Sequence, residues 1–301
     1  MSQAPPPASG VVHDHAATFD DSAYLSGSDE KQSGSVPARR ALFSRARTLG
    51  PVKKEYGDWP LLAMSLVTGL VDGACFTNYG MFVGMQTGNT VILGLSTAGL
   101  PENPHAWLTT LVSIVTFLIG AFLTFRTSAL VTPSGPHTNR LWTTTLFLAQ
   151  AALVLLSAAL ATPANLIPQN PADTDRYTPA PESVLANTKI VALIPPLAFQ
   201  SGIQIATSRL LGFNELPVNV LTSTYCDLMG DLKLLATNNV KRNRRAASVV
   251  LLLIGAIVSG WLMRSSGGLE SILWLSGGLK VLTAAAVFCF MPAEMERKIP
   301  K

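Results

Sequence analysis

Long apolar stretches follow one another along most of the chain, and short polar connections separate them. From Trp59 onward there are eight such stretches, at 59–77, 79–100, 107–131, 141–162, 188–211, 216–237, 246–264 and 269–291. Each has close to the ~20 residues that a helix needs to cross ~30 Å of hydrocarbon. The pattern therefore predicts an all-α, polytopic helical membrane protein with up to eight helical segments.

The second and sixth stretches are the least apolar. The second contains the polar residues at 86–90, and the sixth contains Asp227, Asp231 and Lys233. Such polar surfaces are costly in contact with lipid. We therefore expect these two stretches to belong to discontinuous helices, each making one net crossing together with the stretch before it.

The positions of Lys and Arg distinguish six crossings from eight, because short loops rich in these residues stay in the cytoplasm. The cations at 39–54 and 241–245 place the N-terminus and the loop before the seventh stretch inside. Six net crossings also place Arg126 and Arg140 inside and the acidic loop at 163–187 outside. Eight crossings reverse these last two assignments and stay the alternative.

Composition divides the chain into three parts. Residues 1–57 are rich in Pro, Ser, Gly and Asp and lack a period that could bury a core, so we expect a disordered cytoplasmic tail with a basic collar. A membrane domain at 58–292 and a short cytoplasmic C-terminus at 293–301 follow. The whole chain is 48% hydrophobic and only 13% charged, which argues against a soluble protein.

The membrane domain contains a weak internal repeat, with copies at 58–162 and 188–292. The stretch 69–73 opens one copy and 202–206 opens the other, and a glycine turn and hydroxyl-rich residues follow each. Three net crossings per copy would place the second copy upside down relative to the first. Secondary transporters use this inverted-repeat design, with the substrate site near mid-membrane between interrupted helices.

Four strings of residues make the chain resemble the DUF1275 (YoaK-like) family of multipass membrane proteins. They are Thr68-Gly69-Leu70-Val71-Asp72-Gly73, Thr87-Gly88-Asn89-Thr90-Val91, Gly202-Ile203-Gln204 and Thr222-Ser223. The resemblance covers residues 58–292. The second half departs from the family at Ile205, where Asn is common, and at Ser223, where Gly is usual. The resemblance implies a membrane protein that transports a small molecule, and it names no substrate.

Asp72 is the first candidate for a functional residue. A carboxylate between Leu70 and Phe76 costs at least ~2.5 kcal/mol in hydrocarbon unless protein, water or a counter-charge faces it. A carboxylate at this depth can also exchange a proton, as a proton-coupled carrier requires. The alternative is a hydrogen bond that serves helix packing.

Lys280 lies in the middle of the last apolar stretch. An ion pair with Asp72 or Asp227 would leave neither charge bare in hydrocarbon. The alternative is a side chain that extends to an interface and keeps its ammonium in water.

Uncharged polar groups complete the predicted site. The residues that we expect to line a central substrate site are Asp72, Gln86, Thr87, Asn89, Gln200, Gln204 and Thr222. In an unwound membrane segment such side chains and freed carbonyls can bind an ion or a polar solute. The alternative is that they only satisfy one another across helices. The glycines at 80, 84 and 88 favour close helix packing, within the chain or in a homodimer.

The chain contains no motif of a hydrolase elbow, a zinc protease, a phosphate-binding loop or a redox cysteine pair. We therefore expect no enzyme activity, no cofactor and no metal site. The net charge of +4 comes from loop cations that set topology and contact anionic lipid, so we expect no nucleic-acid partner. The leading hypothesis is a secondary transporter of a small polar or ionic solute by alternating access. A non-transport scaffold or lipid-binding membrane protein is the alternative.

Overall fold

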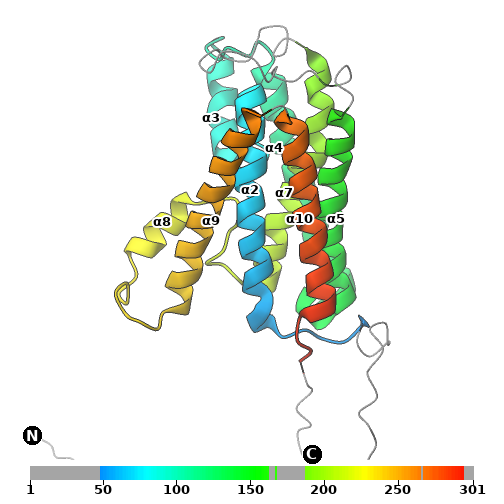
Figure 1. Ribbon diagram of the computed structural model, residues 1–301, viewed down its shortest axis with the longest axis vertical. Coiled ribbons are helices and arrows are strands. Elements are labelled where there is room, and N and C mark those ends of the chain that lie inside the picture. Colours follow the sequence, from blue (N-terminus) through cyan, green and yellow to red (C-terminus); the bar gives the residue numbers. More distant parts are fainter. Residues whose placement is uncertain (1–47, 163–166, 168–186, 266, 295–301) are drawn as a thin grey trace, which may run out of the picture. The chain divides into compact units, whose positions relative to one another are not determined.

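Figure 1 shows a computed structural model of the chain, which describes residues 48–162, 167, 187–265 and 267–294. These residues form eight α-helices and three 3-10 helices, which confirms the predicted all-α class. The predicted tail up to residue 47 and most of the loop at 163–187 lie outside the described residues. The α-helices are α2 (Asp58–Tyr79), α3 (Gln86–Ser96), α4 (Ala106–Val131), α5 (Arg140–Ala161), α7 (Ile194–Leu211), α8 (Thr222–Met229), α9 (Val240–Met263) and α10 (Gly268–Phe290). The 3-10 helices are η1 (Lys54–Gly57), η2 (Pro136–Thr138) and η3 (Thr188–Leu193).

Six helical segments of the described residues are long and apolar enough to cross a membrane. They are Lys54–Tyr79, Ala106–Val131, Arg140–Ala161, Thr188–Leu211, Val240–Met263 and Gly268–Phe290. The polar stretches at 79–100 and 216–237 instead contain the short helices α3 and α8. The chain is accordingly an integral, multi-pass membrane protein with six candidate spans, as the preferred topology requires.

The main helix contacts join the two halves of the chain. α2 packs most extensively on α9, α7 packs most extensively on α4, and α5 packs along α10. The spans differ in how deeply they are buried. Of the most apolar part of each span, 67% is buried in both α2 and α7, against 28% in α4 and 17% in α9. α2 and α7 are therefore the central helices, and α4 and α9 turn most of their apolar surface outward.

Glycines let the backbones approach closely at both of these crossings. A Cβ atom added at Gly255 of α9 would lie 2.1 Å from the Leu66 carbonyl oxygen of α2. A Cβ atom added at Gly202 of α7 would lie 2.2 Å from the Phe117 carbonyl oxygen of α4. Small residues at helix crossings are typical of membrane proteins, where van der Waals packing holds the helices together.

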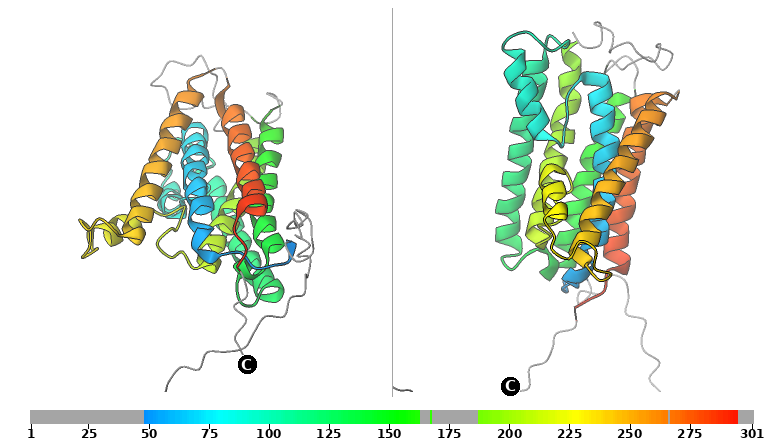
Figure 2. Two further views of the ribbon diagram at one scale, coloured as in Figure 1. Left: turned by 60° about the horizontal axis from the view of Figure 1, so that its bottom comes forward. Right: turned by 90° about the vertical axis from the view of Figure 1, so that its left-hand side faces the viewer.

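A left-handed glycine reverses the chain after each central helix. α2 ends at Gly80, with φ of 63°, and α7 ends at Gly212, with φ of 79°. Irregular segments at 81–85 and 213–221 then lead back into the bundle before α3 and α8 begin. Figure 2 shows α3 lying beside α4 and α8 projecting away from the bundle. The expected discontinuous helices are thus α2 with α3 and α7 with α8.

The residues just before the predicted domain boundary at residue 57 pack against the membrane domain. Val52 is fully buried, forms an isolated β-bridge with Ala293, and donates its N–H to the His137 carbonyl at 2.8 Å. The residues of the predicted tail nearest the membrane domain therefore pack under the bundle. The sequence pattern did not predict this packing, because a single buried valine produces no periodic pattern.

Candidate functional site

One face of α2 carries the residues from which the site is built. Met64, Thr68, Asp72 and Phe76 recur every four residues, so their side chains lie one above another along the helix. We refer to the end of the bundle where α2 begins as the Asp58 end and to the other as the Tyr79 end (Figure 1). Two polar clusters and a cavity follow this stripe from the Asp58 end to the Tyr79 end.

The carboxylate of Asp72 binds the backbone of the segment that leads into α3. Its Oδ1 accepts the N–H groups of Val83 at 2.9 Å and Gly84 at 2.8 Å, and its Oδ2 accepts that of Met85 at 3.1 Å. Carboxylates are stabilised at helix N-termini, where unpaired N–H groups and the helix dipole are positive. The partner that a carboxylate at this depth requires is therefore the start of α3.

Asn89 fixes the same segment from inside α3. Its amide nitrogen donates to the Phe82 carbonyl at 2.6 Å, to Gln86 Oε1 at 2.8 Å and to Ser113 Oγ of α4 at 3.0 Å. Its Oδ1 accepts the Phe82 N–H at 2.9 Å. Gln86 in turn donates to the Val83 carbonyl at 2.8 Å. Together with Asp72, these residues form the Asp72 cluster, which pins the turn between α2 and α3 to both α2 and α4.

Lys280 is the centre of a second cluster. Its side chain has no exposed surface, and its ammonium donates to Gln204 Oε1 at 2.6 Å, to Gln150 Oε1 at 2.9 Å and to Met64 Sδ at 3.1 Å. Gln204 also binds α2 and the segment before α8. Its Nε2 donates to Thr68 Oγ1 at 2.7 Å and to Asn219 Oδ1 at 2.6 Å. The Lys280 cluster therefore joins helices from both halves of the chain.

The expected ion pair of Lys280 with Asp72 or Asp227 is not formed. No carboxylate of a described residue lies within 4.0 Å of the Lys280 ammonium. Asp227, in α8, is 53% exposed, and its Oδ2 lies 3.7 Å from Arg245. Amide oxygens rather than a carboxylate thus stabilise the buried ammonium, which sequence spacing alone does not reveal.

Asp231 also lies apart from the site, just beyond α8. Its Oδ2 accepts a hydrogen bond from Asn239 at 2.9 Å and lies 3.6 Å from Arg245. The bond from Asn239 is the main reason that the pKa of Asp231 lies below its usual range. These contacts join the two ends of the turn between α8 and α9.

The remaining predicted site residues divide into two groups. Gln200 is buried one turn before Gln204 on α7 and donates to Ser201 Oγ at 2.8 Å, while its Oε1 has no hydrogen-bond partner among the described residues. Thr87 and Thr222 are exposed at the starts of α3 and α8. The structure thus brings Asp72, Gln86 and Asn89 into one cluster and Gln204 into the other, and leaves both threonines at the surface.

Sequence reasoning missed residues that complete both clusters. Ser113 and Gln150 lie in the strongly apolar helices α4 and α5, and their side chains make polar contacts to α3 and to Lys280. The available signal was their isolation, because a lone amide in an apolar span needs an internal partner. Asn89, Gln204 and Lys280 expose almost no surface, whereas Gln86 at the edge of the Asp72 cluster is half-buried.

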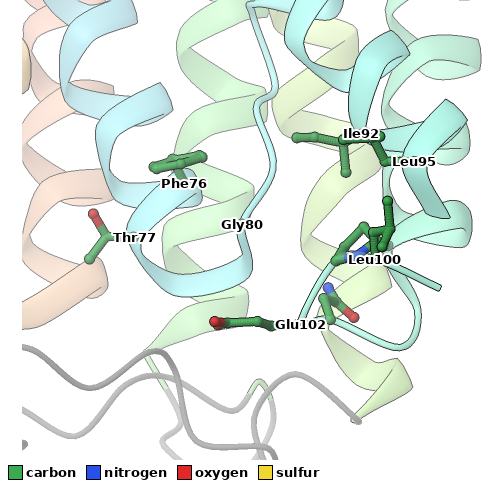
Figure 3. A pocket seen from close by; sticks show the side chains of 10 residues that line it. Phe76, Thr77, Gly80, Ile92, Leu95, Leu100 and Glu102 are labelled. Atoms are coloured by element: carbon green, nitrogen blue, oxygen red, sulfur yellow. The ribbon is translucent and has the colours of Figure 1, made fainter. Parts of the chain in front are cut away.

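A cavity of about 390 Å³ lies at the Tyr79 end of the stripe. Figure 3 shows Phe76 and Thr77 on one side of it, Ile92, Leu95 and Leu100 on the other, and Glu102 along one edge. Phe76 stacks on Phe82 with ring centroids 4.9 Å apart, and the backbone of Phe82 is held by Asn89. The aromatic pair therefore connects the wall of the cavity to the Asp72 cluster.

A comparison with protein families supports the expected resemblance. The family model described as protein of unknown function (DUF1275) matches residues 61–286, from the first turn of α2 to the last turns of α10. A search of curated proteins returned no match, and neither did a search of solved structures.

Proposed function

We propose that this chain, which belongs to the DUF1275 family, is a secondary transporter that moves a small polar or ionic solute by alternating access. The observation that carries the proposal is the position of the Lys280 cluster. It lies where α2, α5, α7 and α10 meet, and its members come from both halves of the chain. Transporters built from two inverted repeats bind their substrates at such an interface.

The packing of the helices supports an inverted repeat. The contact of α2 with α9 corresponds to that of α7 with α4, and each crossing has a glycine at a close backbone approach. Each central helix is followed by a left-handed glycine and a short helix. We infer that 58–162 and 188–292 are two copies of one plan, related by an axis that passes between α5 and α10.

The proposed mechanism uses Asp72 as the movable connection. Three backbone N–H groups bind its carboxylate, and hydrogen bonds to a charged group contribute about 1.5–3 kcal/mol each. When a proton or a bound cation neutralises the carboxylate, these bonds weaken and the start of α3 is released from α2. Rocking of α2 and α7 against their neighbours would then open the stripe to one end of the bundle at a time.

The charge distribution supports a cytoplasmic Asp58 end. The cations at 241–245 lie at the start of α9, Arg140 starts α5, and Arg126 lies in the last turns of α4, all at the Asp58 end. Short loops rich in Lys and Arg stay in the cytoplasm. In this orientation the cavity beside Phe76 faces the outside.

Transport by the full chain in proteoliposomes tests the proposal. Radiolabelled solutes from four classes, namely alkali cations, organic cations, small carboxylates and amino acids, would be supplied with an inward or outward proton gradient. We expect accumulation of at least one class over protein-free liposomes. Asp72→Asn should reduce the rate at least about tenfold. The isosteric amide has no negative charge to bind a proton or a cation, and its NH2 group cannot accept the Met85 N–H. Asp227→Asn, in the exposed carboxylate of α8, is the matched control and should transport normally.

The proposal is wrong if Asp72→Asn, folded as judged by its helix content and gel-filtration profile, transports at the wild-type rate. It is equally wrong if no solute class accumulates in any gradient. The second candidate, a scaffold or lipid-binding membrane protein, would then be preferred. The observation in its favour is that most polar groups of both clusters already satisfy one another.

A further inference from the structure

The cavity at the Tyr79 end has walls that suit an apolar molecule. Phe76 comes from α2, Ile92 and Leu95 from α3, and Leu100 and Pro101 from the loop before α4. Its volume of about 390 Å³ falls within the usual range for small-molecule sites, about 300–1,000 Å³. The walls therefore fit the body of a compact organic molecule such as a substituted benzene.

One of the polar side chains that line the cavity, Glu102, is available to bind a ligand. Asn103 donates its side-chain amide to the Tyr79 carbonyl at 3.3 Å, and its Oδ1 accepts the His105 N–H at 2.8 Å. Thr77 Oγ1 donates to the Gly73 carbonyl at 2.8 Å. Glu102 is exposed at the edge of the cavity, and no hydrogen bond or ion pair joins its side chain to another described residue.

The electrostatic character of the cavity is negative. Glu102 is the charged residue of the lining, and Asp72 lies one helical turn from Phe76 on the same face of α2. Among the described residues, the lining contains no Lys or Arg. An anion would therefore meet repulsion at the entrance, whereas a cation would be attracted.

An aromatic ring adds a second reason to expect a cation. Phe82 stacks against the Phe76 ring, and 52% of Phe76 is still exposed. Cations bind favourably over aromatic faces, also at exposed sites. An ammonium between Phe76 and Glu102 would make both interactions while its apolar substituents contact Ile92 and Leu95.

We propose that this cavity binds an organic cation with an apolar body, with the ammonium beside Glu102 and Phe76 and the body against Ile92, Leu95 and Leu100. The site is distinct from the two polar clusters, and binding to it requires no transport. Equilibrium binding therefore tests this inference separately from the proposed function. Either can fail while the other stands.

The probe is radiolabelled phenyltrimethylammonium, measured by equilibrium dialysis against the full chain in a neutral maltoside detergent, with protein-free micelles as the blank. Radiolabelled benzenesulfonate, an aryl anion of similar size, is the charge control. We expect saturable binding of the cation and none of the anion. Glu102→Gln, which keeps the shape and removes the charge, should weaken binding about two- to fivefold, as expected for losing one exposed charge interaction.

Two further variants locate the site. Ile92→Trp fills the cavity from the partly exposed face of α3 and should abolish saturable binding. Glu270→Gln removes a carboxylate from the first turn of α10, also at the Tyr79 end but outside the lining, and should bind the cation like the wild type.

The proposal is overturned if Glu102→Gln binds the cation as tightly as Glu270→Gln, or if benzenesulfonate binds equally well. Unchanged binding in Ile92→Trp would place the probe elsewhere and also overturn it. A co-purified lipid, seen by mass spectrometry in the wild type, lost in Ile92→Trp and not displaced by the cation, would show that the cavity holds an acyl chain instead.

Discussion

The crossing of α2 and α9 makes a quantitative prediction about two glycines of the same helix. A Cβ atom at Gly255 would lie 2.1 Å from the Leu66 carbonyl oxygen, far inside ordinary van der Waals contact, so α9 would have to move away from α2. A Cβ atom at Gly260 would meet nothing within 4 Å. Gly255→Ala and Gly260→Ala are therefore the same substitution with opposite steric consequences.

Alanine gains about 0.8–1 kcal/mol of helix propensity over glycine at either position. Overpacking a close contact costs about 1–3 kcal/mol. Because the propensity gain is common to both variants, the difference between them isolates the crossing. We expect Gly255→Ala to be about 1–3 kcal/mol less stable than Gly260→Ala, and Gly260→Ala to be at least as stable as the wild type.

Reversible unfolding in mixed detergent and SDS micelles, followed by far-ultraviolet circular dichroism, measures this difference. Gly202→Ala, whose Cβ would lie 2.2 Å from the Phe117 carbonyl, should behave like Gly255→Ala because it tests the corresponding crossing. Gly278→Ala, with open space around its Cβ, should behave like Gly260→Ala. Equal stability of Gly255→Ala and Gly260→Ala would refute the close approach of α2 and α9.

Two further predictions concern the Lys280 cluster and the topology. Gln204→Leu should lower the free energy of unfolding of the wild type by about 1.5–3 kcal/mol more than it lowers that of Lys280→Met, because hydrogen bonds to charged groups contribute about that much. Additive changes in the free energy of unfolding across this double-mutant cycle would contradict the coupling between Gln204 and Lys280. An Asn-x-Thr acceptor placed at Asp173 should be glycosylated in a eukaryotic membrane system, and one placed at Pro136 should not. The reverse pattern would invert the proposed orientation.

The number and type of the helices followed from the sequence because they depend on local properties. The apolar length of each stretch determines whether it can span the bilayer. The polar residues at 86–90 marked the second stretch as unsuited to lipid, and the structure has only the short α3 there. Gly80 and Gly212, recognised as turns, do adopt left-handed backbone at the ends of α2 and α7.

The partners of the buried charges could not be predicted, because they depend on how distant segments meet. Asp72 binds backbone N–H groups, which every residue carries and no sequence pattern distinguishes. Lys280 binds Gln150 and Gln204, which come from two other helices of the bundle. From the sequence, we expected each buried charge to bind an opposite charge. In the structure, peptide N–H groups bind Asp72 and side-chain amide oxygens bind Lys280.

Sided chemical labelling at Thr68 tests the central claim that the stripe of α2 opens alternately to the two ends of the bundle. The native cysteines Cys75, Cys226 and Cys289 would first be replaced by alanine or serine, and Thr68→Cys would be compared with Leu70→Cys, which faces the apolar core. We predict that a membrane-impermeant maleimide modifies Thr68→Cys in both right-side-out and inside-out vesicles, and Leu70→Cys in neither. Modification of Thr68→Cys from one side only, or from neither, would contradict alternating access.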